Sequence, residues 1–279
     1  MRFVRVVAAL LVCGVAAAQV GEKAGADSRR SAGYPSYQQA NTLFVEKKFP
    51  EALNALDAAL RLDPKLVPAL TLKAKLAMAL DRYDVARECL ERAVAADPLS
   101  AYARFLYGFQ FFKQNELPEA IQSLEKARQL DPKDPRPALY LGLAQESLGR
   151  TADALRSYRE AIGLGEASGK LETDMLLSCS RLLLLLGDFE ECGRLVARAL
   201  KLDPKSRDAH FESARLRLKQ GDGGGAAREG ELALQFHTGD VSDRQVHFLL
   251  IQVYRSSGRE GDAARHAVAL RALEQQVQK

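Results

Sequence analysis

Apolar residues recur along this chain with a helical period, in pairs of short segments. The stretch 101–134 shows the pattern most clearly, because Phe105, Phe109 and Phe112 are spaced i, i+4, i+7 and share one helix face. The apolar period then stops and resumes in a second segment that opens near Pro118, a residue suited to the first turn of a helix. This pattern predicts two amphipathic helices joined by a tight turn.

The same pair of segments recurs at a spacing of 34 residues, as the prolines that close successive pairs, Pro64, Pro98 and Pro132, show. Each of these prolines follows an aspartate and disfavours the helical conformation at it. Small residues occupy one position of the first segments: Ala40, Ala74, Gly108, Gly142, Ser180 and Ala214. They also occupy two positions of the second segments: Ala52, Ala86, Ala120, Ala154, Cys192, Ala226, and Ala59, Ala93, Ala127, Ala161, Ala199, Ala233. Such residues allow two helices to approach closely, as we expect for Gly108 against Ala120.

These features resemble the tetratricopeptide repeat (TPR) family, over roughly residues 33 to 277. The resemblance implies an all-α fold, a right-handed α-solenoid of stacked antiparallel helix pairs in which each repeat contacts its neighbours. Two departures are that the chain lacks tryptophan and that the fourth and sixth repeats lack the closing proline. The fold expected from the resemblance does not depend on either.

An array of about six to seven repeats is expected over residues 35–277. The expected repeats are 33–66, 67–100, 101–134, 135–168, 173–206, 207–240 and 244–277. The sixth is predicted to be the weakest, because Gly221 and Gly223–Gly225 crowd its turn and Gly230 interrupts its second helix. No GK[ST] follows these glycines and no strand precedes them, so they do not form a phosphate-binding loop.

The first 18 residues have the features of a secretory signal peptide. Arg2 and Arg5 precede an uncharged apolar run that ends in an A-x-A pattern, which predicts cleavage before Gln19. We therefore expect an exported protein, periplasmic or secreted, with no membrane span after cleavage. The alternatives are an anchor through the uncleaved segment or, less favoured because Val12 precedes it, lipid modification at Cys13. Residues 19–34 lack an apolar period and are expected to form a flexible linker.

Charge and motifs exclude several classes of function. The 40 basic and 36 acidic residues nearly balance, which argues against a nucleic-acid footprint. The four histidines form no metal motif, and no catalytic set or cofactor site is expected, so we predict that the protein is not an enzyme. Cys179 and Cys192 lie on the two helices of one predicted repeat. They are either two buried thiols, which we favour, or a disulfide.

The resemblance to TPR proteins also implies a concave surface, lined by the fifth, ninth and twelfth residues of each first helix. The predicted partner-binding residues are Tyr37, Asn41, Phe44, Lys75, Phe105, Phe109, Phe112, Leu143, Arg181, Phe211, Arg215, Phe248 and Arg255. An apolar middle is thus followed by a basic rim, for which Asp174 and Asp208 are candidate ion-pair partners. Phe111 lies on the opposite helix face and is assigned to the core. The alternative for the three groove phenylalanines at 105, 109 and 112 is burial in the core as well.

Two functions are consistent with these features. The first is an adaptor that binds a protein or peptide segment in the groove, through apolar anchors with acidic flanks. The second is a structural or self-assembling component of a cell-envelope complex. The lysine/asparagine/arginine clamp by which some TPR proteins hold a chaperone's C-terminal carboxylate is not present, since Tyr37 and Leu72 occupy two of its positions.

Overall fold

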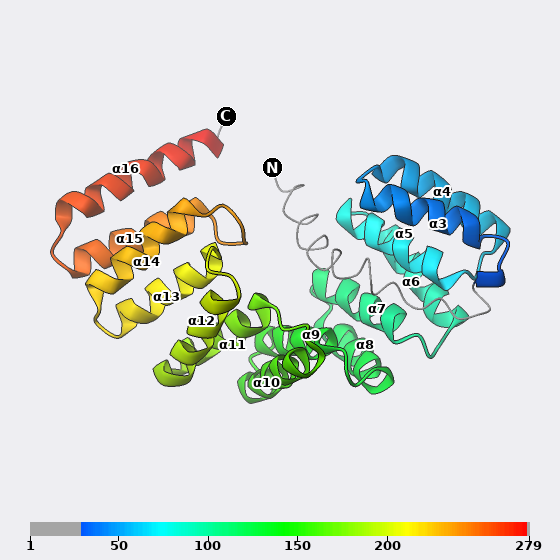
Figure 1. Ribbon diagram of the computed structural model, residues 1–279, viewed down its shortest axis with the longest axis horizontal. Coiled ribbons are helices and arrows are strands. Elements are labelled where there is room, and N and C mark those ends of the chain that lie inside the picture. The colour runs from blue at the N-terminus through cyan, green and yellow to red at the C-terminus, as the bar shows by residue number, and fades with distance from the viewer. Residues whose placement is uncertain (1–28, 278–279) are drawn as a thin grey trace. The chain divides into compact units, whose positions relative to one another are not determined.

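The computed structural model describes residues 29–277, which form fourteen helices and no strand (Figure 1). The first helices of the pairs are α3 (Tyr34–Val45), α5 (Val67–Ala79), α7 (Ala101–Lys113), α9 (Pro135–Ser147), α11 (Thr173–Leu186), α13 (Arg207–Lys219) and α15 (Asp243–Ser256). The second helices are α4 (Phe49–Leu62), α6 (Tyr83–Ala96), α8 (Leu117–Leu130), α10 (Thr151–Ser168), α12 (Phe189–Leu202), α14 (Gly223–Gln235) and α16 (Glu260–Val277). The predicted signal peptide, 1–18, and residues 19–28 of the predicted linker lie outside the described residues.

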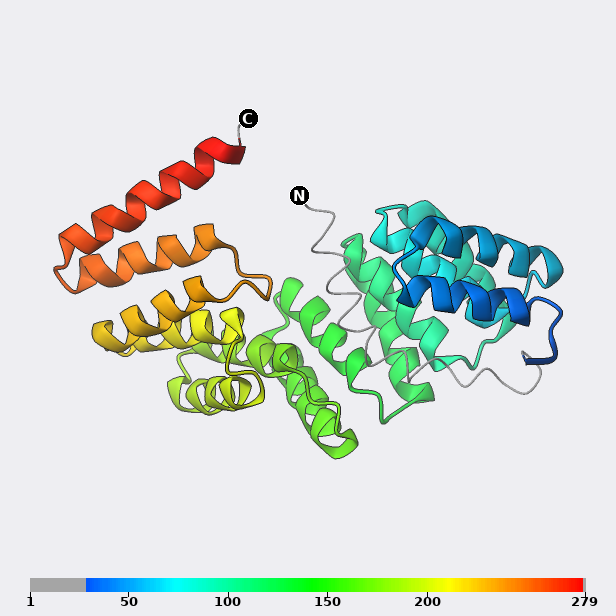
Figure 2. The ribbon, with the colours of Figure 1, turned by 45° about the horizontal axis from the view of Figure 1, so that its top comes forward.

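The predicted all-α fold class, a solenoid of stacked helix pairs, is confirmed. The chain divides into two compact units, here called the N-terminal unit (up to Ser157) and the C-terminal unit (from Tyr158), and the division falls inside α10. Within the N-terminal unit, α3 to α9 pack in chain order, each first helix also touching the next first helix. Helices α11 to α16 do the same in the C-terminal unit, as the turned view in Figure 2 lets the reader follow.

The small residues lie where helices approach most closely. All the predicted small positions of the second helices are buried, with at most 1% of the residue exposed. At Gly108 a Cβ atom would lie 2.7 Å from Cγ of Leu124 and 3.0 Å from its backbone nitrogen, so a larger residue does not fit without movement. The residue of α8 that lies nearest to Gly108 is therefore Leu124.

The recurring Asp-Pro pair forms the turn between repeats. Asp63, Asp97, Asp131 and Asp203 each accept a hydrogen bond at Oδ1 from the backbone N–H two residues on. Asp63, Asp97 and Asp203 have extended backbone angles, as expected for a residue before proline. The turn thus ends one helix and directs the chain into the next repeat.

The glycine-rich sixth repeat is more regular than predicted. Helix α14 begins at Gly223, and Asp222 caps it by accepting from the backbone nitrogen of Gly225 at 2.8 Å. Gly230 does not interrupt the helix: a Cβ atom there would lie 2.6 Å from Cδ2 of Leu250, so the glycine lets α14 pack closely on α15. The prediction of a broken helix at Gly230 is therefore wrong.

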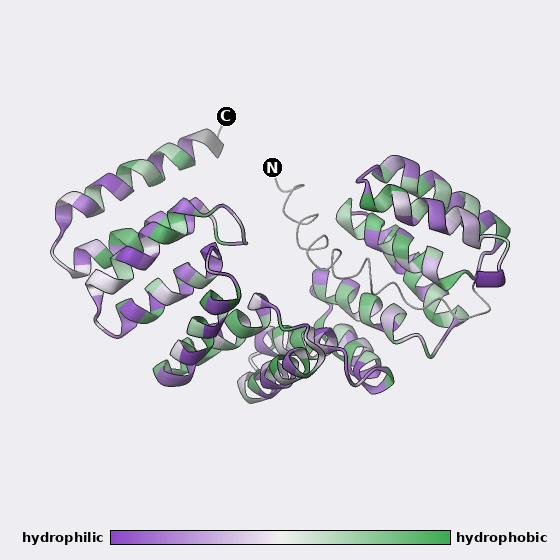
Figure 3. Ribbon diagram, viewed as in Figure 1, coloured by the Kyte–Doolittle hydropathy of each residue, from purple (hydrophilic) through white to green (hydrophobic). Residues whose placement is uncertain are grey.

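Each helix carries apolar and polar residues, seen as alternating green and purple bands in Figure 3. None of the helices within residues 29–277 has the length and apolar content needed to cross a membrane. The described end of the predicted linker makes fixed contacts: Ser31 Oγ donates to Asp63 Oδ2 at 2.6 Å, and Gly33 is buried against Ala59. The first repeat thus already begins within the predicted linker.

Candidate functional site

A cavity of about 490 Å³ lies between α13, α15 and α16 in the C-terminal unit. Its lining residues are Phe211, Arg215, Arg244, Gln245, Phe248, Leu249, Gln252, Leu270 and Glu274. Three of the predicted groove residues, Phe211, Arg215 and Phe248, are thus brought to one hollow. The fifth position of the first helix repeats with the period of the array, which places Phe211 and Phe248 on neighbouring helices at the same height.

The walls of this cavity combine an open apolar surface with charged edges. Phe248 is 57% exposed, which is unusual for a phenylalanine and leaves much of its ring available for contact. The guanidinium of Arg215 lies 6.0 Å from the centre of the Phe211 ring. Arg244 and Glu274 form an ion pair of 2.9 Å that connects α15 to α16. The cavity therefore has the composition of a site for an apolar side chain with a polar neighbour.

The two arginines of the predicted basic rim, Arg181 and Arg215, have other partners than the aspartates that the sequence suggested. Arg215 pairs with Glu212 at 2.8 Å, and Arg181 donates to Ser178 Oγ at 3.1 Å. Burial raises the pKa of the Glu212 carboxyl, which is 3% exposed, while Arg215 and Arg181 act in the opposite direction.

Asp208 instead accepts hydrogen bonds from the backbone N–H groups of Asp240 and Val241, both at 2.9 Å. In the described part of the chain Asp174 forms no ion pair. The expected pairing of Asp174 and Asp208 with the two arginines is therefore wrong: Asp208 fixes the loop before α15, and a nearer carboxylate takes Arg215.

In the N-terminal unit, the first predicted groove residues lie at the start of the stack. The ammonium of Lys75 lies 5.0 Å from the centre of the Phe44 ring, a cation–π distance. The Tyr37 ring is 5.6 Å from that of Tyr34, and Asn41 is exposed. The structure thus brings Phe44 and Lys75, two of the predicted groove residues, together across two repeats.

The three phenylalanines of α7 surround Tyr140 of α9. The centre of its ring lies 5.7 Å from that of Phe105, 4.9 Å from that of Phe109 and 5.7 Å from that of Phe112. Phe105 is only 5% exposed, and the guanidinium of Arg136 lies 4.8 Å from its ring centre. Phe105 is thus a core residue rather than the open anchor expected, because the next repeat supplies an aromatic cover.

Phe109, Phe112 and Leu143 are half-buried, whereas Arg255 is exposed. Tyr140 was missed because the equivalent position of the preceding repeat holds Leu106, a buried aliphatic residue. Arg244, Leu270 and Glu274 were missed because the family's groove positions do not include them, and the last two lie on a second helix. The full set of groove residues stays a prediction, and the cavity beside Phe248 is the part of it with a defined shape.

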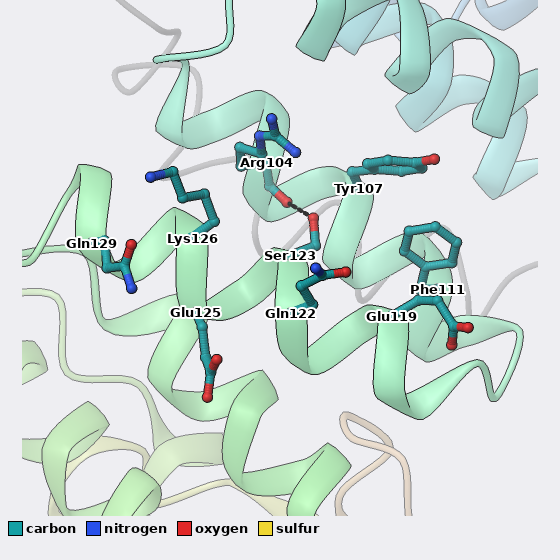
Figure 4. Close-up of a pocket in the computed structure, with 9 residues that line it drawn as sticks. All are labelled: Arg104, Tyr107, Phe111, Glu119, Gln122, Ser123, Glu125, Lys126 and Gln129. Atoms are coloured by element: carbon teal, nitrogen blue, oxygen red, sulfur yellow. Dashed lines mark hydrogen bonds between the residues drawn. The ribbon is translucent and has the colours of Figure 1, made fainter.

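A second hollow, of about 530 Å³, lies on α7 and α8 in the N-terminal unit (Figure 4). Figure 4 shows the carboxylates of Glu119 and Glu125 pointing to different sides, and the guanidinium of Arg104 pointing away from Gln122. The hydrogen bond drawn there, from Ser123 Oγ to the Arg104 carbonyl, is 3.1 Å long and ties α8 to α7. These side chains do not converge on one point, so we assign no chemistry to them. Phe111, at one edge, is 8% exposed, and its assignment to the core is confirmed.

The cysteines and histidines of the C-terminal unit are mostly buried. Cys179 and Cys192 are free thiols, and burial raises the pKa of Cys179 to about 12 and that of Cys192 to about 11. Two buried thiols, the favoured alternative, is thus the arrangement found, and the disulfide is not formed. His210 and His266 are also buried, at 8% and 7% exposed. No group of three or more ligating residues that could hold a metal ion occurs within 29–277.

Comparison with known proteins gives a consistent fold. The family described as Tetratricopeptide repeat matches residues 71–135, 111–169 and 180–241. The chain is 25% identical over 181 residues to anaphase-promoting complex subunit 3 of Schizosaccharomyces pombe, covering 65% of this chain and 26% of that protein. It is 32% identical over 114 residues to the cell division cycle protein 27 homolog of Caenorhabditis elegans, covering 40% and 14%. This chain thus spans about a quarter or less of these relatives.

Solved structures share the fold at low identity. A tetratricopeptide repeat protein from Parabacteroides merdae superposes with a TM-score of 0.65 at 13% identity, covering 86% of this chain and 92% of that one. A structure of the anaphase-promoting complex hetero-tetramer Cut9–Hcn1 superposes with a TM-score of 0.61 at 16% identity, covering 87% and 46%. PilF of Pseudomonas aeruginosa superposes with a TM-score of 0.53 at 20% identity, covering 90% and 99%. These likenesses concern the fold alone.

Proposed function

Since the chain belongs to the tetratricopeptide repeat family, whose fold is suited to protein–protein interaction, we propose that it is an exported, non-enzymatic adaptor. It binds a segment of another protein in the cavity between α13, α15 and α16. The observation that carries this proposal is the open Phe248 ring beside a cavity of about 490 Å³. An apolar hollow rimmed by polar residues is typical of a binding site for another protein.

The charges around the cavity favour a partner with an acidic flank. Arg255 does not line the cavity but follows its lining residue Gln252 by about one helical turn; it is exposed, and the described residues give it no ion pair, so it is open to a carboxylate of a bound segment that extends past the cavity. Arg215 and Arg244 already have acidic neighbours and help to orient the segment rather than attract it strongly. The partner is thus a protein segment with an aromatic or aliphatic anchor for the cavity and an acidic residue beside it.

The relatives support binding, not a particular partner. The fission yeast relative is by its name a subunit of a multiprotein complex, which agrees with a scaffold role for the shared repeats. A barley relative, 29% identical over 137 residues, is by its name a probable N-acetylglucosaminyltransferase, but the match covers only 14% of it. Its activity is not carried over to this chain.

Replacing Phe248 by alanine should weaken the binding of a selected peptide about thirtyfold or more, as loss of an interface hot spot does. The peptide would be selected from a displayed library on the full chain, and its affinity measured by calorimetry. Val268→Ala is the matched control, because Val268 is 64% exposed on α16 but does not line the cavity.

Equal affinity of Phe248→Ala and wild type, at equal helicity, would reject this cavity as the binding site. Sedimentation of the unliganded protein tests the second function considered. A stable closed oligomer that covers α16 would favour the structural component of an envelope complex over the adaptor.

Export is the other part of the proposal. The apolar segment at 1–18 supports it, and the mature protein should begin at Gln19. Sequencing the amino terminus of the protein from the exporting cell measures this directly. A terminus that retains residues 1–18 in a membrane fraction would indicate the uncleaved anchor instead.

A further inference from the structure

Two histidines and a glutamate join the last three helices. Nδ1 of His247, on α15, lies 2.9 Å from Nδ1 of His266, on α16. Nε2 of His266 lies 3.1 Å from Oε1 of Glu231, on α14, and the hydroxyl of Tyr254 donates to the same oxygen at 2.8 Å. The ring of His266 also lies flat on Tyr254, with 5.4 Å between centres. The chain His247–His266–Glu231 therefore connects α15, α16 and α14.

The position of the hydrogens follows from the acceptor at one end. A carboxylate only accepts, so Nε2 of His266 must carry the hydrogen that faces Glu231. In the neutral ring Nδ1 of His266 is then an acceptor, and Nδ1 of His247 must donate to it. The contact between the two Nδ1 atoms holds a single hydrogen. If both rings are protonated, two N–H groups face each other and the contact cannot exist.

His266 is one of the few buried residues of α16. Among the residues of this helix whose burial is described, 260–275, only Ala263 and His266 are buried. Leu270 and Glu274, one and two turns beyond His266, line the cavity from the same helix. The facing wall of the cavity is α15, which carries both His247 and Phe248. A change in the spacing of α15 and α16 at the histidine pair therefore changes the cavity.

We propose that the His247–His266 contact is acid-sensitive, and we call it the joint. When both Nδ1 atoms carry a hydrogen, the contact breaks, α15 separates from α16, and binding in the cavity weakens. The inference rests on the proposed function and names its regulation. Protonated His266 keeps its contact with Glu231, so the break falls between α15 and α16, not between α16 and α14. The partner is held near neutral pH and released in an acidified compartment.

The groups around the pair determine whether acid stabilises or destabilises the contact between the two helices. Burial, first, and His266, second, lower the pKa of His247, while Asp243 and Glu231 act in the opposite direction and Arg207 acts with His266. The other charged or titratable side chains of these helices that contact the group or its neighbours are Tyr254, Arg259, Asp262 and Arg265.

A histidine whose pKa is lower in the closed state than in the open state binds more protons when the helices separate. The closed state therefore has its full stability above the ordinary pKa of about 6.5 and loses it as pH falls below that value.

Hydrogen exchange of the unliganded full chain, corrected for the intrinsic rate, tests the joint without any partner. Between about pH 7.5 and about pH 5, the amides of α16 should exchange severalfold faster in wild type, because acid breaks the contact that holds α16 on α15. The double variant His247→Gln, His266→Gln keeps a donor and an acceptor but cannot titrate, and its exchange should not depend on pH. His237→Gln, an exposed histidine outside the pair, should respond as wild type does.

Unchanged α16 protection in wild type, or a wild-type response in the double variant, would overturn the joint. Nitrogen-15 spectra of the wild-type imidazoles provide a check that needs no variant, since they should show one Nδ1 protonated near neutral pH and both when acidified. If α16 responds but a cavity-binding peptide keeps its affinity, the coupling to the cavity is wrong. If Phe248→Ala binds the peptide as wild type does, the cavity is not the binding site, but the exchange result is unaffected. Failure of the proposed function and failure of the joint are therefore distinguishable.

Discussion

Replacing Arg207 by alanine should destabilise the C-terminal unit by about 2–4 kcal/mol, the cost of leaving two buried carbonyl groups without their charged hydrogen-bond donor. Arg207 is 4% exposed and lies in the first turn of α13. Its Nε donates to the carbonyl of Ala233 at 2.8 Å, its Nη1 to the carbonyl of Val241 at 3.1 Å, and its Nη2 pairs with Asp243. Alanine leaves the two carbonyl groups without this donor in a buried site, and their desolvation is the source of the cost.

Urea denaturation followed by circular dichroism measures this loss, with the slope used to check that the same surface unfolds. Arg194→Ala is the control, because Arg194 forms an exposed pair with Glu190 on α12 that should contribute less than about 0.5 kcal/mol. Similar midpoints for the two variants would contradict the role assigned to Arg207. A midpoint change confined to Arg207→Ala would show that this side chain holds the loop between α14 and α15.

The sequence did not single out Arg207, for a physical reason. Its acceptors are backbone carbonyls 26 and 34 residues further along the chain, and any residue has a carbonyl. The period of the repeat indicates which face of a helix is buried, but not which loop a buried arginine will reach. The same holds for Asp208, predicted to pair with Arg215, which instead accepts from the loop at Asp240 and Val241.

The helix pairs, by contrast, could be predicted closely. Small residues every 34 positions require two helices to approach at the same point in each repeat, and the residues at these positions are buried. The Asp-Pro pairs fix the turns through local hydrogen bonds that need no information from distant residues. What could be predicted is therefore what is set within one repeat.

The candidate site was predictable only in part, because it depends on three helices. Phe211 and Phe248 follow from the period, since each is the fifth residue of a predicted repeat. Leu270 and Glu274 lie on α16, a second helix, and nothing in the period places a second helix at the edge of the groove. The His247–His266 contact depends on the relative rotation of α15 and α16, which one sequence does not define.

Phe105 and Phe248 occupy the same position of their repeats, yet we expect opposite results from their replacement by alanine. Phe105 is 5% exposed between Tyr140, Phe109 and Arg136, so Phe105→Ala should lower the free energy of unfolding by about 3–5 kcal/mol. Phe248 is 57% exposed, so Phe248→Ala should lower it by less than about 1 kcal/mol and reduce peptide affinity instead. Denaturation and calorimetry on both variants measure the two effects.

The comparison separates a core role from a binding role at one repeat position. A small stability change for Phe105→Ala would mean that Tyr140 and Arg136 do not cover it, and would restore Phe105 as an open anchor of the predicted groove. A large stability change for Phe248→Ala would mean that its ring is part of the packing of α15, and any loss of peptide binding would then follow from unfolding. Only the expected pair of results, stability at 105 and affinity at 248, fits a repeat position that is filled by neighbouring aromatics in the N-terminal unit and open in the C-terminal unit.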